Sequence, residues 1–258
     1  MGVLNVTPDS FSDGGRFLDS AKAIDHALRM TDEGADIIDI GGESSRPGSL
    51  PISADEELKR VIPVVEGVRK KSSVTISVDT TKSQVAKQAI GAGANMINDI
   101  SAGRFDPEIL EVASSAQIPI CLMHMKGNPE NMQDDPKYGD LMGEIRDFLA
   151  DAVKRTEMAG VAPEKIIIDP GIGFGKSAQD NVTILKELSK LSALGRTILI
   201  GPSRKSFIGK LLGLTVENRL EATLATLSLA YREGASIFRV HNVAPARRYL
   251  DMVDLLSS

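Results

Sequence analysis

The chain has 258 residues, of which 42% are hydrophobic and 25% charged, and its formal net charge at pH 7 is −5. The apolar share suffices for a buried core, which excludes a disordered chain, and the single cysteine excludes a disulfide scaffold. No apolar run approaches the roughly 20 residues of a membrane-spanning helix, and the mild acidity argues against nucleic acid as a partner. We therefore expect a cytoplasmic protein without a membrane anchor or a secretory signal.

Eight short runs of β-branched or apolar residues recur roughly every 30 residues, which is typical of repeated strand–helix units. Each run is predicted to be a strand. The runs cover residues 2–5, 36–40, 74–78, 95–98, 118–123, 165–168, 197–200 and 236–240. Because they are continuously apolar and do not alternate, they predict parallel strands covered by helices.

Segments between most of these runs show the spacing of amphipathic helices, and the clearest one begins after Ser53. Ser53 and Glu56 form a capping-box pattern at its start. The apolar positions Leu58, Val61, Ile62, Val65 and Val68 follow at helical spacing. Pro63 interrupts this stripe, and we expect it to kink the helix or to restart it.

One local pattern occurs three times, at residues 34–37, 93–96 and 234–237, where Gly-Ala precedes the start of a predicted strand. A glycine at this point ends a helix in the left-handed conformation. The chain is thus built from one repeated unit, and eight such units match a closed (β/α)8 barrel, with residues 1–258 as a single domain. An open, doubly wound sheet is the alternative.

Nearly every predicted strand ends in a polar or charged residue. These residues are Asn5, Asp39, Asp79, Asn98 with Asp99, Met123 with His124, Asp169, the segment 203–205 and Arg239 with His241. In a barrel the strand ends converge on one face, where the active sites of this fold lie. A single Asp at such a position often only caps the next helix, but this many polar ends together predict a site.

The charges are also distributed unevenly among these ends. Carboxylates and amides follow the first six runs, whereas cations gather after the last two and at Arg46. This arrangement suits a ligand with a donor-rich end and an anionic end. Because barrels often bind phosphate near their last two strands, Arg239, His241 and the helix start at residues 203–206 are candidates for anion binding. A purely structural role for His241 is an equally good interpretation.

Residues 170–177, with the sequence PGIGFGKS, resemble the phosphate-binding loop of P-loop NTPases. We reject that interpretation because the P-loop requires glycine where Pro170 stands. The spacing of the three glycines also fails the dinucleotide-binding fingerprint. The only histidines are His26, His124 and His241, and they lack metalloprotease spacing, so a zinc ion held by the protein is not supported.

Taken in chain order, the motifs of this sequence resemble those of the dihydropteroate synthase family. The matching segments are NVTPDSFSDGG (5–15), GGESSRPG (41–48), SVDT (77–80), IND (97–99), LMHM (122–125), DPGIGFGK (169–176), SRKS (203–206) and RVH (239–241). The resemblance extends over nearly the whole chain. It implies a transferase of folate biosynthesis that joins 6-hydroxymethyl-7,8-dihydropterin pyrophosphate to para-aminobenzoate and releases pyrophosphate. It also implies Mg²⁺ as cofactor, a homodimer of (β/α)8 barrels, and a target of sulfonamides.

The same resemblance assigns the site residues one by one. The pterin would be bound by Asp79, Asn98, Met123, Asp169, Gly201 and Lys205. The pyrophosphate would be bound by Asn5, Ser45, Arg46, Arg239 and His241, with Asn5 as a ligand of Mg²⁺. The aminobenzoate would contact Phe11, Pro47, Phe174, Ser203 and the stem of Lys205, beneath a mobile first loop that includes Asp13. Catalytic roles would fall to Asn5, Asp79, Lys205, Arg239 and His241.

The chemistry of these residues agrees with the distribution of charge along the chain. A pterin presents a pair of donors that a carboxylate such as Asp169 accepts with both oxygens. Charge builds on the departing pyrophosphate, where Mg²⁺, Arg239 and His241 would stabilise it. Our hypothesis is a largely dissociative step in which the aromatic amine traps a pterin cation. An aniline needs no strong base, which explains why the sequence shows no obvious pair of nucleophile and base.

The chain departs from the family pattern at three points. Ser45 stands where many members have Thr, and Asn242 stands where some have Asp. The sequence also starts at the first strand, so we expect the usual N-terminal extension to be absent and the stability to be reduced.

Two other functions compete with the synthase. A corrinoid-type methyltransferase shares the barrel and an Asp/Asn pterin pocket, but it has no use for a pyrophosphate site or for the SRKS helix start. A non-catalytic pterin-binding barrel would keep the pocket and lose turnover, yet the cations of the proposed mechanism are all present. The sequence therefore favours the synthase.

Overall fold

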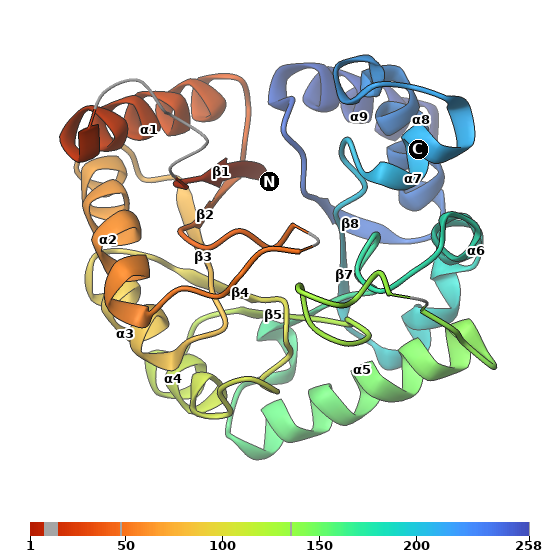
Figure 1. Cartoon of the computed structure of the whole chain (residues 1–258), viewed down its shortest axis with the longest axis horizontal. Helices are drawn as coiled ribbons and strands as arrows, with labels where there is room; N and C mark the ends of the chain where they lie inside the picture. Colours follow the sequence, from red (N-terminus) through yellow and green to blue (C-terminus); the bar gives the residue numbers. More distant parts are fainter. Residues whose placement is uncertain (8–14, 47, 135, 258) are drawn as a thin grey trace.

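The computed structural model of the chain describes residues 1–7, 15–46, 48–134 and 136–257. Within them, eight strands form one parallel sheet in which strands consecutive in sequence are also neighbours in space. The strands are β1 (Gly2–Asn5), β2 (Ile37–Gly41), β3 (Thr75–Asp79), β4 (Met96–Asp99), β5 (Ile120–Met123), β6 (Ile166–Asp169), β7 (Thr197–Ile200) and β8 (Ala235–Phe238). Figure 1 shows them curled around the centre of the molecule.

The first and last strands meet through residues that follow β8. Gly2 and Val240 form an isolated parallel bridge. The Val3 amide donates to the Val240 carbonyl at 3.0 Å, and the Val240 amide donates to the Met1 carbonyl at 2.9 Å. The predicted eighth strand therefore pairs on both sides: β8 pairs with β7, and Val240, just after β8, pairs with Gly2 of β1.

Helices follow the strands and lie around the outside of the sheet (Figure 1). They are α1 (Gly15–Asp32), α2 (Ala54–Lys71), α3 (Ser83–Gly91), α4 (Glu108–Ala116), α5 (Leu141–Met158), α6 (Ala178–Lys186), α7 (Ser206–Leu212), α8 (Leu220–Arg232) and α9 (Val243–Ser257). Short 3-10 turns cover Pro163–Lys165, Leu188–Leu194 and Val216–Asn218. In the described part of the chain, none of the helices combines the length and the apolar character needed to cross a membrane.

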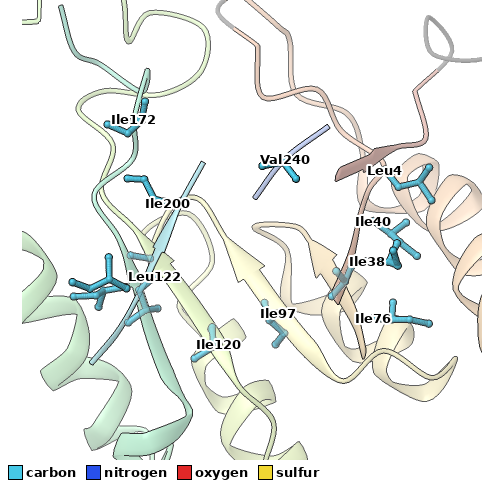
Figure 2. Close-up of a cluster of buried hydrophobic side chains, with 14 of the residues drawn as sticks. Leu4, Ile38, Ile40, Ile76, Ile97, Ile120, Leu122, Ile172, Ile200 and Val240 are labelled. Carbon is cyan, nitrogen blue, oxygen red and sulfur yellow. The ribbon is translucent and has the colours of Figure 1, made fainter. Parts of the chain in front are cut away.

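Alternate residues of each strand face opposite sides of the sheet, and the two sides have separate cores. Side chains such as Ile38, Ile76 and Ile97 belong to the large cluster beneath the helices, part of which Figure 2 shows. The intervening residues form a smaller cluster inside the curled sheet, made of Met96, Cys121, Ile167 and Leu199. This inner cluster fills the space one layer below the carboxyl ends of the strands.

The structure confirms the predicted strands to within two residues at each end and the parallel order. It also confirms the helix-ending glycines, because Gly34, Gly93 and Gly234 all have positive φ angles, between 95° and 116°. Ser53 caps α2 by accepting a hydrogen bond from the Glu56 amide. The predicted restart at Pro63 is wrong: α2 is a single helix that contains Pro63, since the proline costs it only one backbone hydrogen bond and packing stabilises the rest.

Candidate active site

The carboxyl ends of the strands surround a small cavity. Most of the residues that line it come from the last inward-facing position of their strand or from the loop just beyond. The lining residues are Ser45, Asp79, Asn98, Ile100, Met123, Asp169, Ile172, Phe174, Gly201, Lys205 and Arg239. Nine of these were predicted from the sequence as site residues. The fold thus brings together side chains that are more than 190 positions apart in the chain.

Two carboxylates hold Arg239 across this cavity. Its Nε donates to Asp39 Oδ2 at 2.6 Å, and its Nη2 donates to Asp79 Oδ2 at 2.7 Å. Asp39 is fully buried, whereas Asp79 keeps 12% of its side chain exposed toward the cavity. Both pairs raise the pKa of Arg239, so the guanidinium is charged at every accessible pH.

Asp39 belongs to this cluster although the resemblance assigned it no role. Its Oδ2 also accepts a hydrogen bond from Asn98 Nδ2 at 3.1 Å, and its Oδ1 has no hydrogen-bond partner among the described residues. Asp39 faces the inside of the sheet one layer below Gly41. The signal for it was present in the sequence, because Asp39 is a polar residue at a predicted strand end, but nothing there indicated that it pairs with Arg239.

Burial raises the pKa of both carboxylates that line the cavity. The pKa of Asp169 rises to about 6, although the Gly171 amide, 2.6 Å from its Oδ1, and nearby cations oppose the shift. The pKa of Asp79 rises to about 7, because burial outweighs the attraction of Arg239 and because Asp39 repels the charged form. Both carboxyls therefore depend on donors or cations to remain ionised near neutral pH.

Lys205 lines the same cavity as these carboxylates. It is the residue before α7, and its Nζ lies 4.1 Å from the centre of the Phe174 ring, a cation–π contact. Burial lowers the pKa of Lys205 to about 8, with Arg239 adding to the shift. The lysine stem lies against Gly173, where a Cβ atom would be only 3.1 Å from Lys205 Cδ.

His241 and Ser203 form a second group beside the cavity. The Ser203 Oγ lies 3.0 Å from His241 Nδ1 and accepts from the His241 amide at 3.2 Å. Although the His241 side chain is exposed, desolvation of its ring lowers its pKa to about 4, and Arg239 is the strongest of the cations that add to this effect. The neighbouring Asn242, a departure from the family pattern, accepts a hydrogen bond from Arg204 Nε at 3.0 Å.

The loop after β2 carries Ser45 and Arg46 and is anchored at its base. Glu43 accepts from the Ile52 amide at 2.9 Å and pairs with Lys82 at 2.6 Å, and Lys82 also pairs with the buried Glu57. Ser45 lines the cavity, and Arg46 is exposed. The predicted residues Phe11, Asp13 and Pro47 lie outside the described residues.

Asn5 ends β1 beside Gly41 and is half-buried. The described residues contain no group of three His, Cys, Asp or Glu side chains that could hold a metal by themselves. An amide oxygen such as that of Asn5 is nevertheless a hard ligand, and Mg²⁺ is often held by one or two protein oxygens together with substrate phosphates. The donor set therefore fits a Mg²⁺ ion that arrives on a phosphate-bearing substrate.

Two features noted in the sequence, Asp99 and the end of the rejected P-loop pattern, stabilise the local backbone and do not face the cavity. Asp99 accepts from Ser101 and Gly103 and so holds the turn after β4 instead of facing the cavity. Ser177, the last residue of the rejected P-loop pattern, caps α6 in a complete capping box with Asp180. Lys176 of that pattern is buried, with 2% exposure, and is in no position to contact a phosphate.

Comparison with known proteins gives a consistent result. The family model described as "Pterin binding enzyme" matches residues 1–241. A dihydropteroate synthase of Synechocystis is 50% identical over 99% of this chain and 89% of its own length, and one of Escherichia coli is 47% identical over 94% of this chain and 86% of its own. A Yersinia pestis dihydropteroate synthase in a sulfonamide drug complex superimposes with a TM-score of 0.94 at 44% identity, covering 100% of this chain and 93% of that one. A Xanthomonas albilineans dihydropteroate synthase with 4-aminobenzoic acid also reaches 0.94, at 44% identity and with coverage of 100% and 92%.

Proposed function

This chain belongs to the dihydropteroate synthases of the pterin-binding enzyme family, and we propose that it joins 6-hydroxymethyl-7,8-dihydropterin pyrophosphate to para-aminobenzoate, giving 7,8-dihydropteroate and pyrophosphate. One structural observation supports this proposal more strongly than the others do. Asp169 and Arg239 line one cavity, so a carboxylate for a donor-rich heterocycle and a cation for an anion lie within the reach of a single substrate. We take the curled sheet, with its bridge between Gly2 and Val240, to be a closed (β/α)8 barrel.

The pterin is proposed to occupy the inner part of the cavity. Asp169 would accept its paired donors, while Asp79 and Asn98 would bind other edges of the ring and Met123 would pack against it. A donor-rich ligand stabilises the ionised form of a carboxyl whose pKa burial has raised, so pterin binding and the charge of Asp169 support each other. Gly201 leaves the ring room at the end of β7, because it has no side chain.

Pyrophosphate is proposed to bind at the cationic side, through Arg239 and His241 beside the cavity and Ser45 and Arg46 on the loop after β2. The guanidinium already has two carboxylate partners in this structure. When the pterin engages Asp79, the Nη2 edge of Arg239 is released toward the anion, and the buried contact with Asp39 is kept. The same substrate thus frees the cation that binds its leaving group.

We propose that Asn5 binds Mg²⁺ together with oxygens of the pyrophosphate. When bound, the ion neutralises charge that develops on the leaving group. Arg239 and His241 act on the same charge, because a positioned cation or donor stabilises an anion most where water is excluded.

The bond between the pterin methylene and pyrophosphate is proposed to break first. The bond from the amine nitrogen of the aminobenzoate to that carbon forms next, and the amine proton leaves to solvent or to the departing pyrophosphate. Lys205 and Phe174 would flank the aminobenzoate ring, together with Phe11 and Pro47, beneath the first loop with Asp13. For its carboxylate, Ser203 is the candidate from the sequence, and Ser206 is a second one because it is exposed as the first residue of α7.

We further propose that the protein is a cytoplasmic homodimer. Large apolar side chains are exposed on and after α7 (Leu211, Leu212, Val216) and on α9 (Met252, Leu255, Leu256), and a second copy of the chain would cover part of this surface. Light scattering at micromolar concentration tests this, with twice the 27.6 kDa mass of the chain as the expected result.

A direct assay tests the proposed function. The protein is mixed with the pterin pyrophosphate, Mg²⁺ and para-aminobenzoate, and dihydropteroate is measured by chromatography. Asp169→Ala and Arg239→Ala are expected to lose at least 100-fold in kcat/KM, since each removes a charged partner of the substrate. Methyl transfer to cobalamin would instead support the corrinoid-type enzyme, and binding without turnover would support a non-catalytic barrel.

A further inference from the structure

The lysine of the rejected P-loop pattern has an unusual environment in the fold. Lys176 is 2% exposed, and its Nζ has three acceptors: the Phe174 carbonyl at 2.9 Å, the His124 carbonyl at 3.3 Å and His124 Nδ1 at 2.9 Å. An ammonium group has three donors, so each N–H finds one acceptor. Within the described ranges, no carboxylate lies within ion-pair distance of Lys176.

The imidazole of His124 is suited to this contact because it is neutral. Burial first, then the charge of Lys176 and the nearby Arg104, lower the pKa of His124 to about 2. Nδ1 is therefore the acceptor and Nε2 carries the proton. The ring is held by Phe148, which meets it edge-on with 4.9 Å between the ring centres. A buried lysine without a carboxylate partner is costly, and burial lowers the pKa of Lys176 to about 7, so its position demands a reason other than charge pairing.

The three acceptors of Lys176 belong to two segments, the one after β5 and the loop after β6, which the lysine therefore connects. The His124 residue follows β5, and its amide donates to the Asp169 carbonyl at the end of β6 at 2.9 Å. The backbone of Gly171 abuts the His124 carbonyl so closely that a Cβ atom would lie 2.0 Å from it. Lys176 thus fastens the loop of residues 170–176 to the segment after β5.

The loop so fastened carries one wall of the cavity. The Phe174 carbonyl is a direct acceptor of Lys176, and the Phe174 ring lies beneath the Lys205 ammonium. Gly173 supports the Lys205 stem. A shift of this loop would therefore move the ring and the lysine together, and these two groups flank the aminobenzoate ring in the proposed function.

We propose that Lys176 is a positioning residue for the aminobenzoate substrate. By binding both His124 and the Phe174 carbonyl, it holds Phe174 and Lys205 at their working distance. This inference rests on the proposed function for its substrate. It assigns the GlyLysSer pattern a role without a phosphate: the lysine fixes a loop from within the protein, and the serine caps a helix.

The test compares Lys176→Met with two matched controls. The methionine keeps the length and apolar stem but removes all three donors. Val153→Ala shortens a buried side chain of α5 that has no hydrogen-bonding group, and so lowers stability, while Lys186→Met removes an exposed lysine of α6. Steady-state kinetics with each substrate varied are combined with hydrogen exchange of amides 171–175 in the unliganded protein.

For Lys176→Met we expect the KM for aminobenzoate to rise about tenfold, because a loop misplaced by less than 1 Å weakens substrate positioning. The kcat and the dissociation constant of the pterin pyrophosphate should change less than this KM does, because most of the proposed pterin contacts come from other strands, and amides 171–175 should exchange faster. Both controls should show none of these changes. Equal kinetic effects in Lys176→Met and Val153→Ala, or unchanged exchange in the loop, would overturn the proposal. If the wild-type protein makes no dihydropteroate, the proposed function fails, while the exchange experiment still tests the role of Lys176 in the loop.

Discussion

Arg239 is bound to Asp39, a residue 200 positions earlier in the chain, through a hydrogen bond of 2.6 Å between Nε and Oδ2. The carboxylate is fully buried, whereas the second partner of the guanidinium, Asp79, faces the cavity. A ligand can therefore compete for Asp79 and not for Asp39. The buried contact keeps Arg239 in place while its outer edge changes partners.

Asp39→Asn tests whether Asp39 holds Arg239 in place while Asp79 is free to bind a ligand. Without the buried charge, Asp79 is the one carboxylate among the described residues that still pairs with Arg239, so the pterin must compete harder for it. We expect the dissociation constant of the pterin pyrophosphate to rise at least tenfold and the free energy of unfolding to fall by about 3 kcal/mol, as for other broken buried pairs. Calorimetric titration and urea unfolding measure the two effects.

The matched control for this prediction is Asp36→Asn. Asp36 precedes β2, its side chain is 79% exposed, and it pairs with Arg247 at 3.3 Å. An exposed pair of this kind is worth at most about 1 kcal/mol, so neither measurement should change much. A similar loss of pterin affinity in both variants would contradict the special role of Asp39.

Asp169→Asn is expected to stabilise the unliganded protein while it removes pterin binding. Burial raises the pKa of Asp169 from 3.8 to about 6, so between these values the native state binds a proton more tightly than the unfolded chain does. The free energy of unfolding therefore decreases as the pH rises from 4 to 6, and the cost persists above it. The asparagine still accepts from the Gly171 amide, so we expect a gain of about 1–3 kcal/mol at pH 8.

The pH dependence makes this prediction specific. The gain should shrink as the pH falls from 8 toward 4, because Asp169 then becomes protonated in the folded protein and the pH approaches its unfolded-state pKa of 3.8. Urea unfolding of the two proteins at pH 4.5 and pH 8 provides the comparison. An equal change at both pH values would show that burial of the charge is not the cause.

His241 is expected to take up a proton when pyrophosphate binds. In the unliganded protein its pKa is lowered to about 4, so the ring is neutral at pH 6. A bound anion next to the ring raises that pKa, and the affinity for pyrophosphate should increase as the pH falls from 7 to 5.5. Calorimetry in two buffers of different ionisation enthalpy measures the uptake. His241→Gln, measured in the same way, should lack the part of the uptake that belongs to the ring, and identical uptake in both proteins would refute the assignment.

Ser203→Ala and Ser206→Ala distinguish the two serines of the SRKS segment. The Ser203 hydroxyl is buried and occupied by His241, so its loss should weaken pyrophosphate binding more than aminobenzoate binding. Ser206 is exposed at the start of α7, so its loss should raise the KM for aminobenzoate by about threefold to tenfold, the effect of one hydrogen bond to a charged group. The opposite pattern would restore the assignment of the carboxylate to Ser203.

The sequence predicted the elements well because the strands are continuously apolar and the helices end at glycines such as Gly93. Polar strand ends and the family resemblance together predicted most of the cavity, since the strand ends of a barrel converge on one face, although Asp99 holds a turn instead of facing the cavity. Pairings between distant residues were beyond the sequence: nothing near Asp39 in sequence indicates Arg239, and nothing near His124 indicates Lys176. Such contacts depend on how far each strand is shifted relative to the others, which a pattern of apolar residues leaves open. The restart at Pro63 was predicted wrongly for a related reason, because the packing of α2 outweighs a single lost hydrogen bond.

The lone cysteine of the chain lies in the cluster inside the curled sheet. Cys121 has no exposed surface, and burial raises the pKa of its thiol well above the usual value, so the thiolate that reacts with maleimides or iodoacetamide does not form there. A cysteine introduced at the surface would consequently be the single site of labelling in an otherwise unmodified chain. Fluorophores or spin labels could then be attached at chosen loops to follow their movement during turnover, with no need to remove a native thiol first.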